Sequence, residues 1–407
     1  MKHLEEVFKT GGIPTYTFVR PLEYPAVTVA LRTPGRGVVL EGPSGIGKTT
    51  AVTRALDDLG LSHRVKKLSA RRRDDLIELR DLSRQRSFGT VLIDDFHRLP
   101  VECKAEIADL AKVLADEETA DCKLILVGIN KAGESLIRFA YDLNTRLDIL
   151  SLETNPDEKV AELVTRGENA LNISVNVKSE IVVASHGSFY IAQMLCHQAC
   201  LDAGVLEEQP AFRTTAVSFE TIRGKVFDRL SRSYMERTKR FARGTRFRRA
   251  GRAPYFHLLR LLAQSQEWSI NIDQAIAAEP YLAGSITQIV EKGYLEGFLS
   301  HDDELMSVIH FDASSRVLSV EDPQFVYFLR TIPWSKFARD VGFVSVDIRA
   351  KYDFALSFAG CDREIAAALN DELQDREFAV FYDRNEQHRI LAEDVEDYLR
   401  PIYQSDA

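Results

Sequence analysis

At 407 residues the chain is too long for one ordinary hydrophobic core, so its length predicts two to four domains. Hydrophobic residues make up 45% of it and charged residues 28%, which is the composition of a soluble globular protein. The formal net charge of -9 excludes a global basic field that would attract nucleic acid or an anionic membrane. The first residues contain no signal-peptide core, and no apolar run approaches roughly 18 residues, so we expect a cytoplasmic protein with no membrane partner.

The strongest motif is GVVLEGPSGIGKTT at residues 37–50, where an apolar strand leads into a glycine-rich loop and then a helix. The loop has the full G-x-x-x-x-G-K-[ST] spacing of a phosphate-binding loop (P-loop). Its glycines allow backbone N–H groups to turn toward phosphates, and the helix N-terminus adds its dipole. We expect Lys48 to reach the β- and γ-phosphates of ATP and Thr49 to bind Mg²⁺. The expected nucleotide-binding residues are Gly42, Pro43, Ser44, Gly45, Ile46, Gly47, Lys48, Thr49, Thr50 and, from a later strand, Asp94.

Later strands of this region also end in polar residues. TVLIDDFHRL places Asp94 and Asp95 at the end of an apolar strand, where a carboxylate would face the phosphate loop. Asp94 is expected to hold the Mg²⁺ hydration shell and Asp95 to polarise the attacking water. The strand CKLILVGIN ends at Asn130, which could orient water near the γ-phosphate, and Arg146 closes a helix before the next apolar strand. The alternation of strands and helices predicts an α/β fold with a parallel sheet covered on both faces.

This order of motifs resembles AAA+ ATPases, and their STAND signalling branch in particular. By the resemblance, Asn130 matches the sensor position and Arg146 the arginine finger, which acts on the nucleotide of a neighbouring subunit. The alternative is that Arg146 only caps its helix. STAND proteins carry Gly-x-Pro in a helical lid, and at that place this chain has Gly187, Ser188 and Phe189 within helices expected over residues 155–205.

Two other segments have less specific patterns. The N-terminal GGIPTYTFVRPLEY stands where such ATPases place the adenine, and its Ile13, Tyr16 and Phe18 are candidates for that pocket or for the core. CHQAC, at residues 196–200, has metal-binding residue types, but its flanks continue a helical apolar pattern and no second ligand pair stands at zinc spacing. We interpret it as a buried helix. The odd number of scattered cysteines, five, is typical of a reducing compartment.

Residues 221–253 carry twelve Lys or Arg against Asp228 and Glu236. The aromatic residues Phe227, Tyr234, Phe241 and Phe247 recur among them at spacings that an amphipathic helix would bury. Such a segment can bind nucleic acid. The other two interpretations, the solvated face of a connecting helix and an acceptor for an acidic partner, are favoured.

Residues 254–332 predict three helices, a pair of strands near 305–312 and 316–322, and a closing helix, an order that resembles a winged helix. Its third helix would enter a major groove in a DNA reader. That helix offers Ser285, Gln288, Glu291 and Lys292, with one cation against phosphate repulsion, so an intramolecular packing module is favoured.

The end of the chain resembles the first half of a bacterial Toll/interleukin receptor (TIR) domain. The matching residues are YDFALSFAG at 352–360, DRE at 362–364 and FYD at 381–383. The resemblance implies NAD cleavage, with Phe358, Gly360, Asp362 and Arg363 lining the NAD pocket. The family's catalytic glutamate lies on a helix after a third strand. We therefore expect the natural protein to continue past Ala407, and NAD cleavage only in a chain with a complete TIR domain.

The resemblances imply an ATP-dependent, NLR-like STAND switch that forms a homo-oligomer and activates a TIR NAD hydrolase in antiviral (antiphage) defence. ATP or ADP with Mg²⁺ would be its cofactors, and a phage protein or nucleic acid its trigger. The alternatives are an AAA+ ATPase that acts on nucleic acid through its winged helix and basic segment, and a TIR domain that is only an assembly adaptor. The expected domains are an ATPase core with the adenine-side segment at 1–154, a helical lid at 155–220, the basic connecting segment at 221–253, the winged helix at 254–342 and the partial TIR domain, of flavodoxin-like fold, at 350–407.

Overall fold

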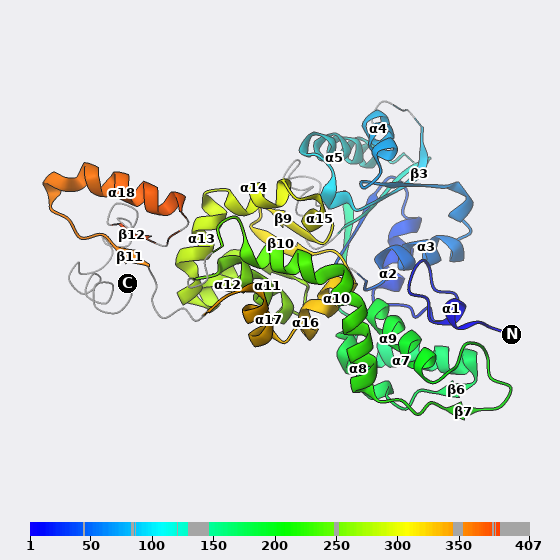
Figure 1. Ribbon diagram of the computed structural model, residues 1–407. Helices are drawn as coiled ribbons and strands as arrows, with labels where there is room; N and C mark the ends of the chain where they lie inside the picture. Colours follow the sequence, from blue (N-terminus) through cyan, green and yellow to red (C-terminus); the bar gives the residue numbers. More distant parts are fainter. Residues whose placement is uncertain are drawn as a thin grey trace. The chain divides into compact units, whose positions relative to one another are not determined.

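The structure, a computed structural model, describes residues 1–43, 45–82, 85, 87–119, 121–128, 146–247, 252–344, 353–376, 378 and 380–382. The chain divides into two compact units, Met1–Val226 and Phe227–Ala407. Each unit is described by itself below, with the elements labelled as in Figure 1. Within the described residues, no helix has the length and apolar character needed to cross a membrane.

The first unit is built on a five-stranded sheet whose strands are all parallel, in the order β2-β3-β4-β1-β5. The strands are β1 (Gly37–Glu41), β2 (Val65–Ser69), β3 (Gly89–Asp94), β4 (Cys122–Val127) and β5 (Leu147–Ser151). The prediction of a mixed α/β fold with a parallel sheet is confirmed. The sheet brings the carboxyl ends of β1 and β3 to the same edge, separated by the single strand β4.

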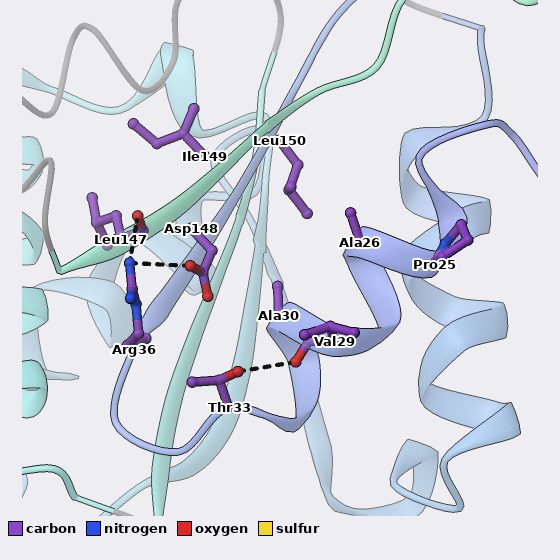
Figure 2. A pocket seen from close by; sticks show the side chains of 10 residues that line it. All are labelled: Pro25, Ala26, Val29, Ala30, Thr33, Arg36, Leu147, Asp148, Ile149 and Leu150. Atoms are coloured by element: carbon purple, nitrogen blue, oxygen red, sulfur yellow. Dashed lines mark hydrogen bonds and ion pairs between the residues drawn. The ribbon is translucent and has the colours of Figure 1, made fainter.

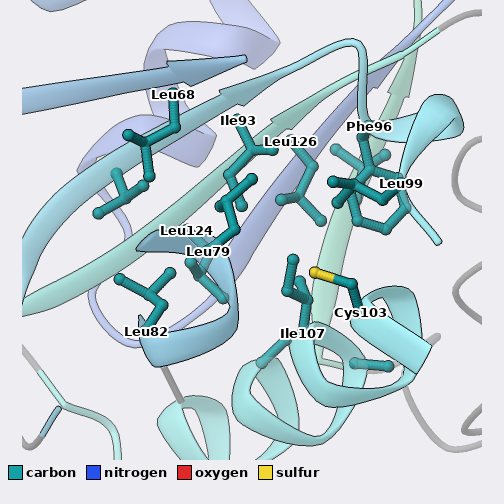
Figure 3. Packing of buried hydrophobic residues seen from close by; sticks show 14 of the residues in the cluster. Leu68, Leu79, Leu82, Ile93, Phe96, Leu99, Cys103, Ile107, Leu124 and Leu126 are labelled. Carbon is teal, nitrogen blue, oxygen red and sulfur yellow. The ribbon is translucent and has the colours of Figure 1, made fainter. Parts of the chain in front are cut away.

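Helices cover both faces of this sheet because successive strand residues point to opposite sides. Ile93 and Leu126 pack on one face against α4 (Arg73–Leu82) and α5 (Val101–Asp116), as Figure 3 shows, and Val39 belongs to the same cluster. Leu40 and Ile125 pack on the other face against α2 (Tyr24–Arg32) and α3 (Lys48–Asp58). Two single-turn 3₁₀ helices, η1 (Ser62–Arg64) and η2 (Phe96–Arg98), complete the connections. Burial on both faces explains why the central strands β1, β3 and β4 are largely apolar.

Three helices follow the sheet, α7 (Asp157–Leu171), α8 (Lys178–Ser185) and α9 (Phe189–Asp202), and residues 155–220, which contain them, are called the lid below. The short strands β6 (Ile173–Ser174) and β7 (Arg213–Thr214) pair beside them. CHQAC lies inside α9, where Cys196 and Cys200 are buried free thiols, so the prediction of a buried helix is confirmed. Burial raises the pKa of Cys200 to about 12, which keeps the thiol neutral and unreactive.

The N-terminal segment, residues 1–21, packs against the lid and includes α1 (Leu4–Val7). The backbone N–H of Leu4 donates to the carbonyl of Leu206, and the N–H of Glu208 donates to the carbonyl of Lys2. Phe8 is fully buried against Gly167 of α7, where an added Cβ would lie 2.1 Å from its ring. The segment is therefore a strap fixed to the lid along most of its length.

The long helix α10 (Phe219–Arg243) crosses from the first unit into the second. Most of its buried residues recur every three or four positions and form one stripe: Ile222, Val226, Leu230, Tyr234, Thr238 and Phe241, with Ala242 buried beside the last. The helix ends before Gly244, which has a φ of +62° and lies so close to the ring of Tyr255 that a Cβ would clash at 2.1 Å. The expectation that Phe247 is buried in this helix is wrong, because Phe247 follows that glycine and is 39% exposed.

The rest of the second unit begins with helices around a three-stranded antiparallel sheet of order β8-β10-β9. Its elements are α11 (Pro254–Gln264), β8 (Ser269–Asn271), α12 (Ile272–Ala278), η4 (Pro280–Leu282), α13 (Ala283–Glu291), α14 (Tyr294–Ser300), α15 (Asp303–Met306), β9 (Ile309–Asp312), β10 (Val317–Val320), α16 (Pro323–Thr331) and α17 (Trp334–Val341). The strand expected from 305 starts only at Ile309, because Asp302 caps the short helix α15 by accepting from the N–H of Leu305. Ser285 and Gln288, which a DNA reader would present to the groove, are buried in α13.

The last described elements form a small parallel unit. It contains β11 (Phe354–Ala355), η5 (Gly360–Asp362), α18 (Arg363–Asp375) and β12 (Val380–Phe381), and Phe354 of β11 pairs with Val380 of β12. A helix that connects two parallel strands is a βαβ unit. Residues 383–407 lie outside the described part of the chain.

Candidate nucleotide-binding site

The P-loop connects β1 to α3 and depends on glycines for its shape. Gly45 and Gly47 have left-handed φ values of +76° and +103°, which an L side chain rarely adopts. At Gly42 a Cβ would lie 2.2 Å from the carbonyl oxygen of Leu152, so this position has no room for a side chain. Gly45 and Gly47 therefore have the backbone conformations that a loop needs to turn its N–H groups toward a phosphate.

Lys48 is the first residue of α3, and its Nζ donates to two carbonyl oxygens of the same loop. The distances are 2.8 Å to Gly42 and 2.7 Å to Pro43. Burial lowers the pKa of Lys48 from 10.5 to about 8, while Asp94 and Asp95 act in the opposite direction. The ammonium is thus held inside the loop, where a phosphate oxygen could replace the carbonyl oxygens as its partner.

Thr49 and Asp94 meet at the edge of the sheet. The Thr49 hydroxyl donates to Oδ2 of Asp94 at 3.2 Å, and burial raises the pKa of the Asp94 carboxyl. A hydroxyl and a carboxylate are oxygen ligands of the kind that Mg²⁺ prefers, and Mg²⁺ usually takes its other ligands from water and phosphates. Within the described residues, no cluster of three His, Cys, Asp or Glu offers another metal site in the chain. The two residues therefore fit a nucleotide-bound Mg²⁺.

Asp95 is turned away from the P-loop and toward the end of β2. It has a φ of +56°, and its carboxylate accepts from Arg71 at 2.6 and 3.1 Å and from the Ser69 hydroxyl at 3.5 Å. Sequence reasoning missed Arg71 and Ser69, although RRR at 71–73 directly follows a strand whose carboxyl end lies beside that of β3. That adjacency was the signal that could have identified them.

The lid rests directly on the P-loop. The Asn155 side chain donates to the carbonyls of Ile46, at 3.3 Å, and Gly187, at 2.9 Å. Ser188 donates its hydroxyl to the Gly45 carbonyl at 3.4 Å, and the N–H of Tyr190 donates to the same oxygen at 3.3 Å. The N-terminus of α9, which carries Gly187-Ser188-Phe189 in place of Gly-x-Pro, is therefore a direct neighbour of the loop that would hold the phosphates.

A pocket of about 130 Å³ adjoins the P-loop. Its walls come from three parts of the first unit: the strap, the loop and the lid. The lining residues are Lys9, Gly11, Gly12, Pro14, Thr17, Phe18, Val19, Pro21, Gly45, Ile46, Gly47, Thr50, Leu163, Phe189, Tyr190 and Gln193. Of the three strap residues suggested by the sequence, Phe18 lines this pocket, whereas Ile13 and Tyr16 are not among its lining residues.

Arg146 directly precedes the edge strand β5, and its Nε forms an ion pair with Asp116 at 2.5 Å. A second, wider pocket of about 740 Å³ lies between α2 and β5 (Figure 2). The ion pair of Arg36 and Asp148, at 3.1 Å, forms part of its wall. The P-loop residues do not line this pocket. Asn130 and Ser44 lie outside the described residues.

The four residues suggested for an NAD pocket lie on the segment that leads into α18. The Arg363 guanidinium lies 5.4 Å from the centre of the Phe358 ring, which in turn lies 5.6 Å from the ring of Tyr382. Gly360 and Asp362 belong to η5. Phe358 and Arg363 are thus held together by a cation–π contact.

No protein-family model and no curated protein matches the chain, but solved structures resemble it in fold. The RuvB Holliday junction branch migration motor of Thermotoga maritima is 16% identical, with a TM-score of 0.40 over 78% of this chain and 100% of that one. Aeropyrum pernix ORC1, solved in complex with DNA, is 13% identical, with a TM-score of 0.42 over 79% and 96%. Aeropyrum pernix ORC2, solved with ADPNP and ADP, is 17% identical, with a TM-score of 0.41 over 83% and 96%. At such low scores these similarities assign neither a function nor a partner to the chain.

Proposed function

We propose that this chain is an ATP-hydrolysing nucleotide switch of the AAA+ type. The observation that carries the proposal is the P-loop itself, with Lys48 buried inside it and Thr49 bonded to Asp94 across the sheet edge. Lys48 and the loop N–H groups would bind the phosphates, and Thr49 and Asp94 would hold Mg²⁺. The metal ion neutralises phosphate charge when it is bound. Asp95 would polarise the attacking water after release from Arg71.

The contacts between lid and loop support a switch rather than a simple hydrolase. Asn155, Ser188 and Tyr190 all bond to carbonyls of the P-loop or of the adjoining turn. A phosphate that reshapes the loop would change these bonds, so each nucleotide state would favour its own lid position. We propose that the STAND-like output is self-association, with Arg146 completing the site of a neighbouring copy.

The proposed effector is a TIR domain that begins at residue 350. The parallel pairing of β11 with β12 around α18 supports this proposal, because a TIR domain starts with a βαβ unit. NAD would be the substrate of the complete domain, with Phe358 and Arg363 at its pocket. An antiphage role is the broader proposal that follows from this combination of switch and effector.

Thermal unfolding tests the nucleotide site. ATP with Mg²⁺ at a hundredfold excess over Kd should stabilise the protein by roughly 2.7 kcal/mol, and Lys48→Ala should abolish the shift. Lys67→Ala is the matched control, because the Nζ of Lys67 contacts Thr53 on α3 and not the loop. An unchanged melting curve for the wild type in millimolar ATP would remove the proposal.

A second candidate function, action on nucleic acid, is favoured by one surface of α10. Arg229 and Arg232 are exposed there, and neither has an ion-pair partner among the described residues. Other basic residues of the helix are paired, as Arg240 is with Asp302 and Glu304. Salt-dependent binding to duplex DNA that weakens in Arg229→Ala and Arg232→Ala, but not in the Glu220-paired control Arg223→Ala, would support this candidate.

A further inference from the structure

The pocket beside the P-loop contains a polar pair that can distinguish one purine base from another. Its volume, about 130 Å³, is below the roughly 300 Å³ at which sites for whole drug-sized ligands begin, so it suits one ring system. Thr17 of the strap and Gln193 of α9 both line it, with exposures of 0% and 6%. Two parts of the unit that are far apart in sequence thus meet at the place next to the phosphates where a base would lie.

The hydrogen bonds of Thr17 fix the orientation of the Gln193 side chain. The Thr17 Oγ1 lies 3.0 Å from the Val7 carbonyl oxygen and 3.0 Å from the nearer atom of the Gln193 carboxamide. A hydroxyl carries one proton, so it cannot donate to two oxygens at once. In a fully buried group, an unsatisfied contact of this kind costs about 1–3 kcal/mol.

A half-turn of the carboxamide, which exchanges its nitrogen and oxygen, resolves the conflict. The Gln193 amide nitrogen then donates to Thr17 Oγ1, and the Thr17 hydroxyl donates to the Val7 carbonyl. The hydroxyl proton and one amide proton of Gln193 then each have an acceptor. The Gln193 Oε1 becomes the atom without a partner among the described residues, and it is an acceptor only.

Two other polar side chains of the pocket, those of Lys9 and Tyr190, bond to backbone carbonyls. The Nζ of Lys9 donates to the Ile13 carbonyl at 3.1 Å, and the Tyr190 hydroxyl donates to the Thr10 carbonyl at 3.0 Å. Gln193 therefore presents an acceptor whose direction is set by a chain of bonds through Thr17 to the backbone of α1.

We infer that Gln193 selects adenine in the nucleotide pocket, with Thr17 as its positioning residue; this inference rests on the proposed nucleotide-binding function. Adenine carries an amino donor at position 6, whereas guanine carries an oxygen acceptor there. The donor would bond to Gln193 Oε1. The oxygen at position 6 of guanine would instead face Gln193 Oε1. Neither oxygen carries a proton, so no hydrogen bond forms and guanine is repelled.

Inosine diphosphate provides the sharpest test, because it resembles ADP but has an oxygen at position 6. Wild-type protein should bind ADP at least tenfold more tightly than inosine diphosphate in calorimetry, in line with the cost of one unpaired buried group. Gln193→Met should bring the two affinities within about threefold of each other, and Thr17→Val should reduce the preference in part. Gln198→Met is the matched control on the same helix, because Gln198 bonds to Asp202 and does not line the pocket, so it should keep the full preference.

The outcomes separate this inference from the function on which it rests. If the wild type binds both nucleotides equally, or if Gln193→Met keeps the preference, the role of Gln193 is overturned while nucleotide binding stands. If the wild type binds neither nucleotide, both the inference and the proposed function are overturned. Circular dichroism and the melting temperature of each variant establish that a lost preference is not lost folding.

Discussion

Lys48 lies inside the proposed nucleotide site, so its ionisation should affect nucleotide binding. Its ammonium is buried and bonded to the carbonyls of Gly42 and Pro43, and burial lowers its pKa from 10.5 to about 8. A nearby phosphate favours the charged form of a lysine and would raise this pKa again. Nucleotide binding and protonation of Lys48 are therefore coupled above pH 8.

We predict that ADP affinity falls as the pH rises from 8 toward 10.5, by up to about tenfold per pH unit. In this window the free protein has lost the Lys48 proton and must regain it to bind phosphate. Below pH 8 the lysine is already charged, so the affinity should not change for this reason. Calorimetry at pH 9 in two buffers of different ionisation enthalpy should show proton uptake, and a heat independent of buffer would contradict the coupling.

Asp95 gives a second prediction at the scale of one residue. Its carboxylate is paired with Arg71 and is not a partner of Thr49, whose hydroxyl bonds to Asp94. Asp95→Asn should therefore bind ATP like the wild type but hydrolyse it about 10² to 10⁴ times more slowly, the usual contribution of a general base. Asp75→Asn is the control, since Asp75 accepts from the Ser69 N–H at the same sheet edge and has no proposed part in the chemistry. Equal hydrolysis by Asp95→Asn and the wild type would exclude the proposed role of Asp95.

At the scale of elements, the N-terminal strap depends on a glycine in the lid. A Cβ at Gly167 of α7 would lie 2.1 Å from the Phe8 ring, whereas a Cβ at Gly224 of α10 would meet nothing within 4 Å. Both residues are helical, so Ala should favour the helix by roughly 0.5–1 kcal/mol at either position. Only at Gly167 does the buried aromatic ring oppose that gain.

Gly224→Ala should accordingly raise the melting temperature slightly, while Gly167→Ala should lower stability by about 1–3 kcal/mol. For a unit of this size, each kcal/mol of lost stability lowers the melting temperature by roughly 2–4 °C. Gly167→Ala should also weaken ADP binding, because the strap forms one wall of the pocket beside the P-loop. If both variants gained stability, Phe8 would not be packed against α7 as described.

The elements that could be predicted from the sequence are those with a strong local pattern. The central strands β1, β3 and β4 are largely apolar on both faces, and the P-loop spacing marks the turn between β1 and α3. The short β8 and the helices α14 and α17 were not predicted. β8 and α14 are too short to establish a period, whereas the helical spacing of Trp334, Phe337 and Val341 in α17 was a signal that could have identified that helix. The burial of Ser285 and the exposure of Phe247 likewise depend on distant partners.

The residues of the candidate site are likewise of two kinds, those that a local motif predicts and those that only the fold brings together. Lys48, Thr49 and Asp94 follow from motifs, because short stretches of chain place them. The bond from Asn155 to the loop, the pairing of Arg71 with Asp95 and the pair formed by Thr17 and Gln193 join residues between 24 and 176 positions apart in the sequence. Only the folded sheet and lid bring such groups together, so no short motif marks these bonds, and for Arg71 the signal is that β2 and β3 end side by side.

At the scale of the whole molecule, the chain has two units, and the proposed switch requires contact between copies. Arg146 is the residue on which that requirement can be tested. In one copy its guanidinium is paired with Asp116 at the end of α5. An arginine that acts in trans must leave such a pair to reach the neighbouring nucleotide, whereas a structural arginine depends on it.

Arg146→Ala should therefore bind ATP normally and hydrolyse it more slowly, by a factor that can reach 10³ to 10⁵ for arginine fingers. Asp116→Asn removes the same ion pair but leaves the guanidinium, so it should keep hydrolysis if Arg146 acts in trans and should match Arg146→Ala if the pair is structural. Mixing Arg146→Ala with Lys48→Ala subunits tests the geometry further. Each mixed contact can place the intact Arg146 of one subunit beside the intact P-loop of the other, so part of the hydrolysis should return. Co-assembly without any recovery would assign Arg146 to a structural role within its own subunit.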